Sequence, residues 1–593
     1  MLQEPEVFFI ISPSFFEKIP GLPGRRRKRY ATVMPLYRKA CLFRPACGLS
    51  RKRDAGIPAL LGAEGYPPTG RDLAGNGAKP RWTATSVQRA PCLRGRYPLT
   101  TTKVDGAEGK PEEGGRSLSS RGFFRPLRDK RYCMCGIFGI SGHPEAARMA
   151  YFGLYALQHR GQESTGIASY DGKHIRLHAG MGLVPDVYDE ATLGQELQGN
   201  RAIGHVRYST SGVSVRKNAQ PLVVRVCGIE IALAHNGNLT NASELRGELE
   251  SEGAIFQTSS DSEIFVHLIA RSLAKKKDLE EAILSACDRV RGAYSLIILS
   301  EGRIIALRDA HGFHPLAMGK VDDAYVFASE TCAFDLLEAE YLREVLPGEM
   351  VVVDGDKVVS RPLNNAGKVP VRQCIFELVY FARPDSIVFG EDVYQCRKHM
   401  GYEMAKEAPT DAELVMPFPD SGVYAAIGFA HAAGVPYEQA YIRNHYVGRT
   451  FIQPSQTMRN FGVRVKLNPV RSMIKNRRIC IVDDSIVRGT TVRTRVVKLR
   501  ELGAREVHFR VSCPPLRHPC FYGINFSSRG ELVAANHPLE ALPGLLNLDS
   551  LHYLTIEGLL NSVSEPDKYC LACFNGEYPV ACGGQCSCCG SAE

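Results

Sequence analysis

Residues 477–514, RRICIVDDSIVRGTTVRTRVVKLRELGAREVHFRVSCP, have the pattern of a strand, a loop, a helix and a second strand. The first apolar strand ends at two adjacent acids, Asp483 and Asp484, and the helix that follows the loop stops at Gly503. One face of this helix carries its apolar residues, Val492, Val496, Leu499 and Leu502. A strand–helix–strand unit builds a parallel sheet, and such sheets bind ligands at the carboxyl ends of their strands.

The loop at residues 485–491 carries groups that bind a phosphate ester. Gly489 lets backbone N–H groups approach an anion, neighbouring hydroxyls add donors, and the helix N-terminus favours negative charge. Asp483 and Asp484 fit beside a phosphate if they hold a cation or the hydroxyls of a sugar. We therefore predict a ribose phosphate site with Mg²⁺, and an ordinary acidic loop at a strand end is the alternative.

The preceding part of the chain has a different pattern. Up to about residue 366, short apolar strands alternate with turn residues: AIGHVRY (202–208), IEIALAHNG (229–237), YSLIILS (294–300) and AYVFAS (324–329). One helix is expected at residues 260–276, with Ile264, Leu268 and Leu273 on one face. The pattern predicts stacked sheets flanked by helices.

Residues 1–133 lack this regularity and hold most of the positive charge. The 593-residue chain has a formal net charge of +10, but its first 133 residues contain 26 basic and 11 acidic residues, so the rest is slightly acidic. Nucleic-acid binding is therefore not expected of the main body. We predict that residues 1–134 are a disordered extension. It is either a transit peptide or, as its acidic residues favour, sequence upstream of a misassigned start. Met134 would then be the initiator, and its removal would expose Cys135.

The composition argues for a protein that neither crosses a membrane nor depends on disulfides. No apolar run of about 18 residues or more occurs in the sequence. We therefore expect no membrane span and a cytoplasmic location. The 19 cysteines are scattered through a long chain, which favours reduced thiols, metal ligation or catalysis.

Cys135 acquires a particular chemistry if it is the first residue of the chain. A free α-amine has a pKa of about 7.7–8.0, so an amino-terminal cysteine carries its own base. For an isolated cysteine, a small buried thiol is the alternative. Five motifs follow one another from here: MCGIFGI, LQHRGQESTGIA, GHVRYST, AHNGNLTN and TSSDSE. Together they resemble the class II glutamine amidotransferases, whose amino-terminal cysteine hydrolyses the side-chain amide of glutamine.

This resemblance implies roles for the matching residues. Cys135 would form a γ-glutamyl thioester and release ammonia. The side chain of Asn236 and the backbone N–H of Gly237 would form the oxyanion hole. Arg207 would bind the α-carboxylate of glutamine and Asp261 its α-ammonium group, although a surface ion pair is the alternative for these two.

The loop that contains the two acids resembles the phosphoribosylpyrophosphate (PRPP) signature of type I phosphoribosyltransferases. PDSGVYAAIGFA (419–430) and NHYVGRTFIQPSQTMR (444–459) extend the match, and nearly all of 135–575 resembles the amidophosphoribosyltransferase family. The resemblance implies Mg²⁺ at Ser421, Asp483 and Asp484. It implies that five residues bind the 5-phosphate of PRPP: Ser485, Arg488, Gly489, Thr490 and Thr491. It also implies a lid at 444–459 and pyrophosphate contacts, Arg449 and Lys466.

Four cysteines are candidate metal ligands. Cys570 and Cys573 form a C-x₂-C pair, and Cys374 and Cys520 occur in other motifs of the second half. Thiolates suit Zn²⁺ or an iron–sulfur cluster, while inert core thiols are the alternative. Members of the resembled family with all four positions hold a [4Fe–4S] cluster, so the resemblance implies that cluster here. We assign no role to the cysteines of the tail, Cys582, Cys586, Cys588 and Cys589.

These patterns predict a two-domain enzyme of the α+β and α/β classes. An N-terminal-nucleophile αββα sandwich is expected at residues 135–366, a parallel-sheet phosphoribosyltransferase domain at 367–560, and a Cys-rich terminal segment at 561–593. The expected reaction converts glutamine, PRPP and water into 5-phosphoribosylamine, glutamate and pyrophosphate, the committed step of purine synthesis. The resemblance also implies a homotetramer inhibited by purine nucleotides.

Two other functions compete with this interpretation. A glucosamine-phosphate synthase would share the glutaminase motifs, but its sugar-isomerase half has no use for a PRPP loop. A regulator with the phosphoribosyltransferase fold that binds nucleotides or RNA would not need Cys135, Asn236 and Gly237.

Overall fold

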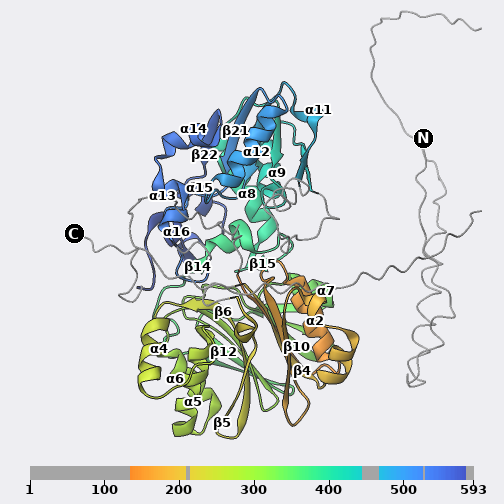
Figure 1. Ribbon diagram of the computed structural model, residues 1–593, viewed down its shortest axis with the longest axis vertical. Coiled ribbons are helices and arrows are strands. Elements are labelled where there is room, and N and C mark those ends of the chain that lie inside the picture. The colour runs from red at the N-terminus through yellow and green to blue at the C-terminus, as the bar shows by residue number, and fades with distance from the viewer. Residues whose placement is uncertain (1–133, 209–213, 444–466, 525–527, 582–593) are drawn as a thin grey trace, which may run out of the picture. The chain divides into compact units, whose positions relative to one another are not determined.

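The computed structural model describes residues 134–208, 214–443, 467–524 and 528–581 (Figure 1). All of them belong to one compact unit, Arg121–Glu593. They form two antiparallel sheets, one parallel sheet and three two-stranded ribbons. The predicted fold class, an αββα sandwich followed by a parallel sheet, is confirmed.

The first sheet has seven antiparallel strands in the order β11-β9-β10-β1-β4-β2-β3. Its strands are β1 (Gly136–Ser141), β2 (Ser164–Tyr170), β3 (Ile175–Met181), β4 (Arg201–Arg207), β9 (Ala317–Val321), β10 (Ala324–Ala328) and β11 (Glu340–Glu344). Strand β1 is buried along its whole length because it lies between β4 and β10. Two helices, α2 (Ala146–Ala156) and α7 (Cys332–Leu337), pack beside this sheet (Figure 1). Three short helices complete this part: α3 (Val184–Val187), η2 (Thr192–Glu196) and η3 (Arg216–Asn218).

The second sheet has six antiparallel strands in the order β13-β12-β8-β7-β6-β5. Its strands are β5 (Leu222–Val226), β6 (Ile229–Leu239), β7 (Gly292–Ser300), β8 (Arg303–Arg308), β12 (Glu349–Asp354) and β13 (Lys357–Pro362). Three helices cover its outer side: α4 (Ala242–Ser251), α5 (Ser262–Lys276) and α6 (Leu279–Cys287) (Figure 1). Ile137 and Ile203 of the first sheet meet Ala234 and Ile297 of the second in the apolar layer between the sheets. The expected strands and the helix at 260–276 are confirmed as β4, β6, β7, β10 and α5.

The parallel sheet has four strands in the order β17-β20-β21-β22. They are β17 (Leu414–Pro417), β20 (Arg478–Asp483), β21 (Glu506–Val511) and β22 (Ser550–Tyr553). The helices around this sheet are α8 (Val393–Glu407), α9 (Val423–Ala433), α12 (Thr490–Glu501), α14 (Leu542–Leu546) and α15 (Ile556–Leu560). Val492, Val496 and Leu499 of α12 are buried, as the predicted apolar face requires. Asp483 thus ends a central strand, where the carboxyl ends of parallel strands meet.

Short elements complete the second half. Strands β14 (Gln373–Cys374) and β23 (Tyr569–Cys570) pair in parallel, although nearly 200 residues separate them. The short helix η4 (Glu377–Phe381) follows β14 directly. The remaining elements are β15 (Ile387–Val388), β16 (Glu391–Asp392), β18 (Tyr441–Arg443), β19 (Leu467–Pro469), α11 (Arg471–Ile474), η5 (Arg529–Glu531), α13 (Val533–Asn536), η6 (Leu539–Ala541), η7 (Pro566–Lys568) and α16 (Ala572–Asn575). Within the described ranges, none of the helices has the length and apolar character of a membrane span.

Candidate active site

Cys135 lies immediately before β1, and the pairing of that strand fixes its position. The side chain is buried, and its thiol donates to the carbonyl oxygen of Tyr208 (Sγ···O 3.6 Å). Burial raises the pKa of this thiol to about 11. At neutral pH the thiol of the uncut chain is therefore almost entirely protonated, which makes it a poor nucleophile.

A pocket at Cys135 brings together four of the residues expected to act on glutamine. Cys135, Arg207, Gly237 and Asp261 all line it. Arg207 ends β4, Gly237 lies on β6, and Asp261 immediately precedes α5. The other residues that line this pocket are Tyr208, Gln220, His235, Ser260 and Ser262. Three elements that are distant in the sequence thus converge on the thiol.

The charged residues of the pocket, Arg207 and Asp261, are both buried. This excludes the alternative of a surface ion pair. Arg207 has its Nη1 atom 4.0 Å from Oε2 of Glu163, and Oδ2 of Asp261 accepts a hydrogen bond from the Leu239 N–H at 2.9 Å. A cation and an anion at one pocket match the α-carboxylate and the α-ammonium group of a free amino acid.

Strand β6 carries the two residues expected to form an oxyanion hole. Gly237 has φ +154°, and a Cβ atom at this position would lie 2.1 Å from the carbonyl oxygen of Ala293. Only glycine fits there. Asn236 is buried, and its Nδ2 has no hydrogen-bond partner in the described part of the chain. A buried amide donor without a partner is costly unless a ligand accepts from it. Asn236 is not among the residues that line the pocket, although it directly precedes Gly237.

A polar network behind the pocket was missed by sequence reasoning. The backbone N–H of His235 donates to Oε1 of Gln220 at 2.8 Å, and Nε2 of Gln220 donates to Oγ of Ser262 at 2.9 Å. His235 Nδ1 lies 2.9 Å from the same hydroxyl. Burial lowers the pKa of His235, which favours its neutral form. His235 and Ser262 lie inside quoted motifs, whereas no motif pointed to Gln220.

The two acids expected at the second site lie at the carboxyl end of β20 and are both buried. Burial, and then the neighbouring charge of Asp484, raise the pKa of Asp483 well above its usual value. The N–H of Asp484 donates to Oδ1 of Asp483 at 3.0 Å, and Ser485 donates its hydroxyl to Oδ2 of Asp484. Two buried carboxylates side by side bind a cation or a proton, so this strand end fits Mg²⁺.

Ser421 lies beside the same strand end. The N–H of Phe418 donates to the carbonyl oxygen of Val482 at 3.0 Å. A Cβ atom on Gly422 would lie 2.3 Å from that oxygen, so the backbone next to Ser421 is pressed against β20. The structure therefore brings the three expected Mg²⁺ residues together at the carboxyl end of the parallel sheet.

The loop expected to bind a phosphate leads into the N-terminus of α12. Gly489 has φ +72°, a conformation that favours glycine, and directly precedes the first helical residue. Thr490 and Thr491 are exposed in the first turn of this 12-residue helix. Arg488 forms an ion pair with Glu531 (3.0 Å). Backbone N–H groups and hydroxyls therefore meet at a helix N-terminus, where an anion is favoured.

The four cysteines expected to hold a cluster are free thiols that lie close enough to interact electrostatically. Cys374 and Cys570 are direct partners in the β14–β23 pair. Burial, and then the proximity of Cys374, Cys570 and Cys520, raise the pKa of Cys573. The N–H of Tyr522 donates to the sulfur of Cys520 (3.4 Å).

The spacing of these sulfurs bears on the choice of metal. Among the described residues, no three of them lie within 4.8 Å of one another. A tetrahedral Zn²⁺ with Zn–S bonds of about 2.3 Å would bring its thiolates to about 3.8 Å. A zinc ion would therefore have to draw these side chains closer together, and the iron–sulfur cluster remains what the family resemblance implies.

One further group could hold a cation. Ligand atoms of Asp411, Glu506 and His508 lie within 4.8 Å of one another. Glu506 begins β21, whereas Asp483 lies opposite Val511 at the other end of that strand, so this group and Asp483 lie at opposite ends of the parallel sheet. Asp411 is exposed and already pairs with Arg478 (2.9 Å). This group of three residues does not coincide with any site predicted from the sequence.

Several predicted features lie outside the described residues. They are Arg449 and Lys466, the lid at 444–459, the extension at residues 1–133, and the tail cysteines Cys582, Cys586, Cys588 and Cys589.

Known proteins resemble this chain over about three quarters of its length. A family model described as a glutamine amidotransferase domain matches residues 205–335. The amidophosphoribosyltransferase of Synechococcus elongatus is 47% identical over 466 residues, which cover 78% of this chain and 94% of the relative. That of Bacillus subtilis is 47% identical over 454 residues, 75% of this chain and 94% of the relative. The chain belongs to the amidophosphoribosyltransferase family.

The fold of this family member agrees with a solved relative. The structure of glutamine PRPP amidotransferase from B. subtilis, complexed with ADP and GMP, matches with a TM-score of 0.72 and 46% identity. The match covers 76% of this chain and 98% of that one. As an amidophosphoribosyltransferase, the chain is a pentosyltransferase of purine biosynthesis that uses glutamine and PRPP. A glucosamine-phosphate synthase and a non-catalytic regulator are both excluded.

Proposed function

We propose that Cys135, once it is the amino-terminal residue, cleaves glutamine, and that the ammonia attacks PRPP bound beside Asp483. The convergence of Cys135, Arg207, Gly237 and Asp261 on one pocket carries this proposal. In this assignment residues 135–366 form the glutaminase domain and 367–560 the phosphoribosyltransferase domain. Residues 561–593 add cluster ligands and a tail.

The thiol needs a base, and a free α-amine on Cys135 supplies one. The thiolate attacks the side-chain carbonyl carbon of glutamine, a C–S bond forms, and negative charge develops on the oxygen. Asn236 and Gly237 donate to this oxygen, and one such donor contributes ~3–4 kcal/mol in comparable sites. The amine then returns its proton to the departing nitrogen, ammonia leaves, and water hydrolyses the thioester to glutamate.

Arg207 and Asp261 select the substrate in this proposal. Arg207 binds the α-carboxylate and Asp261 the α-ammonium group, which together orient the side-chain amide toward Cys135. Correct orientation of a bound substrate contributes several kcal/mol to catalysis, so both residues affect turnover as well as binding.

At the second site, the 485–491 loop and the N-terminus of α12 hold the 5-phosphate of PRPP. Ser421, Asp483 and Asp484 are the residues that would hold Mg²⁺. When bound, Mg²⁺ supplies positive charge to the diphosphate of PRPP, which favours its departure from C1 of the ribose. We assign the pyrophosphate contacts to Arg449 and Lys466 on the strength of the family resemblance alone.

The cluster and the assembly complete the proposal. Cys374, Cys520, Cys570 and Cys573 would hold a [4Fe–4S] cluster that joins three segments distant in the sequence. The ADP and GMP in the B. subtilis structure support inhibition by purine nucleotides. A homotetramer follows from the family resemblance, and the cytoplasmic location expected from the sequence stays a prediction.

The central test compares two nitrogen donors. Cys135→Ala is expected to abolish glutamine-dependent synthesis of phosphoribosylamine and to keep ammonia-dependent synthesis, because ammonia bypasses the first site. Asp483→Ala is expected to abolish both. A Cys135→Ala protein that still uses glutamine would contradict the assignment of the nucleophile.

A further inference from the structure

A buried arginine contacts the backbone of the nucleophilic residue. Arg160 lies in the turn that follows α2, and its side chain is fully buried. Its Nε donates to the carbonyl oxygen of Cys135 at 3.1 Å. Arg160 is not among the residues that line the glutamine pocket, so its side chain contacts Cys135 from outside that pocket.

The contact matters because Cys135 lies just before the first paired residue of the central strand β1. The hydrogen-bonded ladder of β1 with β4 begins one residue later, at Gly136 opposite Val206. A cysteine that begins the chain has no preceding peptide bond to restrain it. Its carbonyl group is then a principal backbone group by which the residue can be held in place, and Arg160 donates a hydrogen bond to it.

The turn that carries Arg160 is itself tightly placed. A Cβ atom on Gly161 would lie 2.5 Å from the carbonyl carbon of Val206 and 2.7 Å from the nitrogen of Arg207. The turn is therefore pressed against the end of β4, where the pocket begins. A shift of Arg160 would move both the nucleophile and the residue proposed to bind the α-carboxylate.

Two carboxylates hold the guanidinium of Arg160. Glu377 accepts from Nη2 at 2.7 Å and from Nη1 at 3.0 Å, which is a bidentate pair. Glu330 accepts from Nη1 as well. Burial opposes these charges. The carboxylates nevertheless raise the pKa of Arg160, and Arg160 helps to lower the pKa of each carboxylate. All three groups therefore remain charged.

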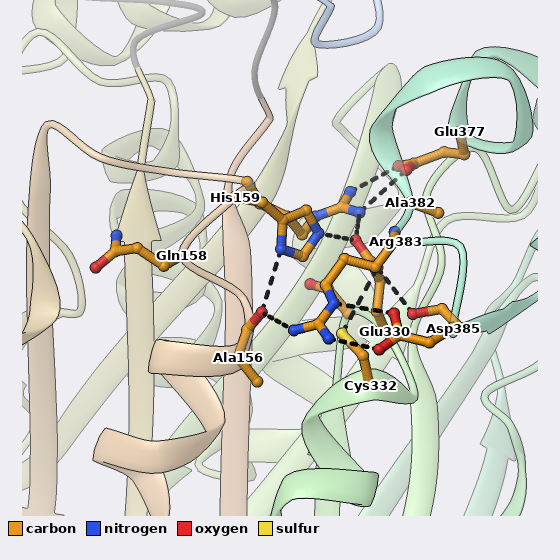
Figure 2. A network of polar contacts seen from close by, with 12 residues as sticks. Ala156, Gln158, His159, Glu330, Cys332, Glu377, Ala382, Arg383 and Asp385 are labelled. Atoms are coloured by element: carbon orange, nitrogen blue, oxygen red, sulfur yellow. Dashed lines mark hydrogen bonds and ion pairs between the residues drawn. The ribbon is translucent and has the colours of Figure 1, made fainter. Parts of the chain in front are cut away.

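The carboxylates connect the turn to the second half of the chain. Glu377 begins η4, three residues after Cys374. Glu330 accepts from the backbone N–H of Arg383 at 2.8 Å and from Oγ of Ser386 at 3.0 Å. In Figure 2, His159 points toward Glu330, while the side chain of Arg383 points toward Asp385 and the carbonyl oxygen of Ala156. The carbonyl of Cys135 is thus linked through one side chain to residues 377–386.

We propose that Arg160 and Glu377 are a positioning pair that holds Cys135 in the geometry needed to attack glutamine. The proposal rests on the role assigned to Cys135. Reacting atoms must approach to about 3–3.5 Å, and a misplacement of about 1 Å can cost about 100-fold in rate. A guanidinium makes several hydrogen bonds in one plane, whereas an ammonium cannot reproduce that fork. The pair should therefore affect the use of glutamine and leave the use of ammonia intact.

The test uses Arg160→Lys and Glu377→Gln in the full chain, with the mature amino terminus checked by mass spectrometry. Arg308→Lys is the matched control, because Arg308 is another fully buried arginine that pairs with a carboxylate (Glu344, 3.1 Å) and does not contact Cys135. Each variant is assayed with glutamine and with ammonia, and the rate at which a glutamine-like electrophile alkylates Cys135 is measured.

We expect Arg160→Lys to lower the glutamine-dependent kcat by about 10- to 100-fold and the alkylation rate of Cys135 in parallel, with ammonia-dependent kcat within about twofold of wild type. Glu377→Gln should shift the same ratio in the same direction. Combined with Arg160→Lys it should add little, because the two residues act as a unit. Arg308→Lys should change both activities by the same factor.

Three results would overturn the proposal. The first is an unchanged ratio of glutamine to ammonia turnover in both Arg160→Lys and Glu377→Gln. The second is a loss in Arg160→Lys that Arg308→Lys matches in that ratio. The third is full additivity of the two substitutions. If one variant does not fold, as a loss of ammonia-dependent turnover would reveal, the other still decides. Retention of glutamine use by Cys135→Ala would instead refute the assigned nucleophile.

Discussion

The chain that begins at Cys135 and the uncut 593-residue chain should differ in the reactivity of one thiol. In the uncut chain, burial raises the pKa of Cys135 to about 11. At pH 7.5 the thiolate fraction is then about 3 × 10⁻⁴. A free α-amine has a pKa of about 8 and is largely protonated at this pH, and a positive charge beside a thiol lowers the pKa of that thiol by up to about 3 units, so the thiolate becomes far more common.

The size of the expected difference follows from two opposing effects. A fall of about 3 units in the effective pKa raises the reactive fraction at pH 7.5 by several hundred-fold. The intrinsic nucleophilicity of a thiolate falls with its pKa, with a Brønsted slope of about 0.4–0.5, and this fall cancels about 20-fold of the gain. The cut chain should therefore be alkylated about 10- to 100-fold faster at Cys135.

The assay is alkylation by iodoacetamide between pH 6 and 10, followed by peptide mass spectrometry. Cys227 is exposed and serves as an internal control that should react equally in both chains. The rate at Cys135 should level off above about pH 8 in the cut chain. In the uncut chain it should rise about tenfold per pH unit throughout, since the pKa is near 11. Equal rates and a shared profile for the two chains would refute the amine-as-base argument.

Three further outcomes test the other assigned residues. Gly237→Ala should lower glutamine-dependent kcat/KM by about 100-fold or more and spare ammonia use, because its Cβ would meet the Ala293 carbonyl oxygen at 2.1 Å; normal glutamine kinetics would contradict the oxyanion role. Asp483→Asn should abolish turnover with both nitrogen donors and hold or raise the metal-free melting temperature, because it removes repulsion between buried carboxylates; a lower melting temperature would count against that repulsion. Cys374→Ser should remove most of the about four iron atoms expected per anaerobically purified chain, whereas Cys396→Ser, which changes a buried thiol outside the four, should keep them; iron-free wild-type protein with full activity would argue against the cluster.

The local patterns of the sequence were sufficient to predict stacked sheets in the first half and a parallel sheet in the second, whereas the site residues of the first half were assigned by family resemblance. Alternation along AIGHVRY and IEIALAHNG predicted strands that occur as β4 and β6. The switch to strand–helix–strand units after residue 370 predicted the parallel sheet, which places Asp483 at a carboxyl edge. These features follow from the chain itself, because the period of apolar residues and the position of glycines act over a few residues.

The environment of the nucleophile was decided by the tertiary structure. Arg160 and Glu377 are 217 residues apart, and no local signal pairs them. Gln220 meets Ser262 across 42 residues, and Cys374 meets Cys570 through a strand register that spacing alone does not predict. The pKa of Cys135 is likewise a collective property, because it depends on how many groups from separate elements exclude water from the thiol. Residue types and their local order determine which chemistry is available, while burial and long-range contacts determine which groups are charged, oriented and able to react.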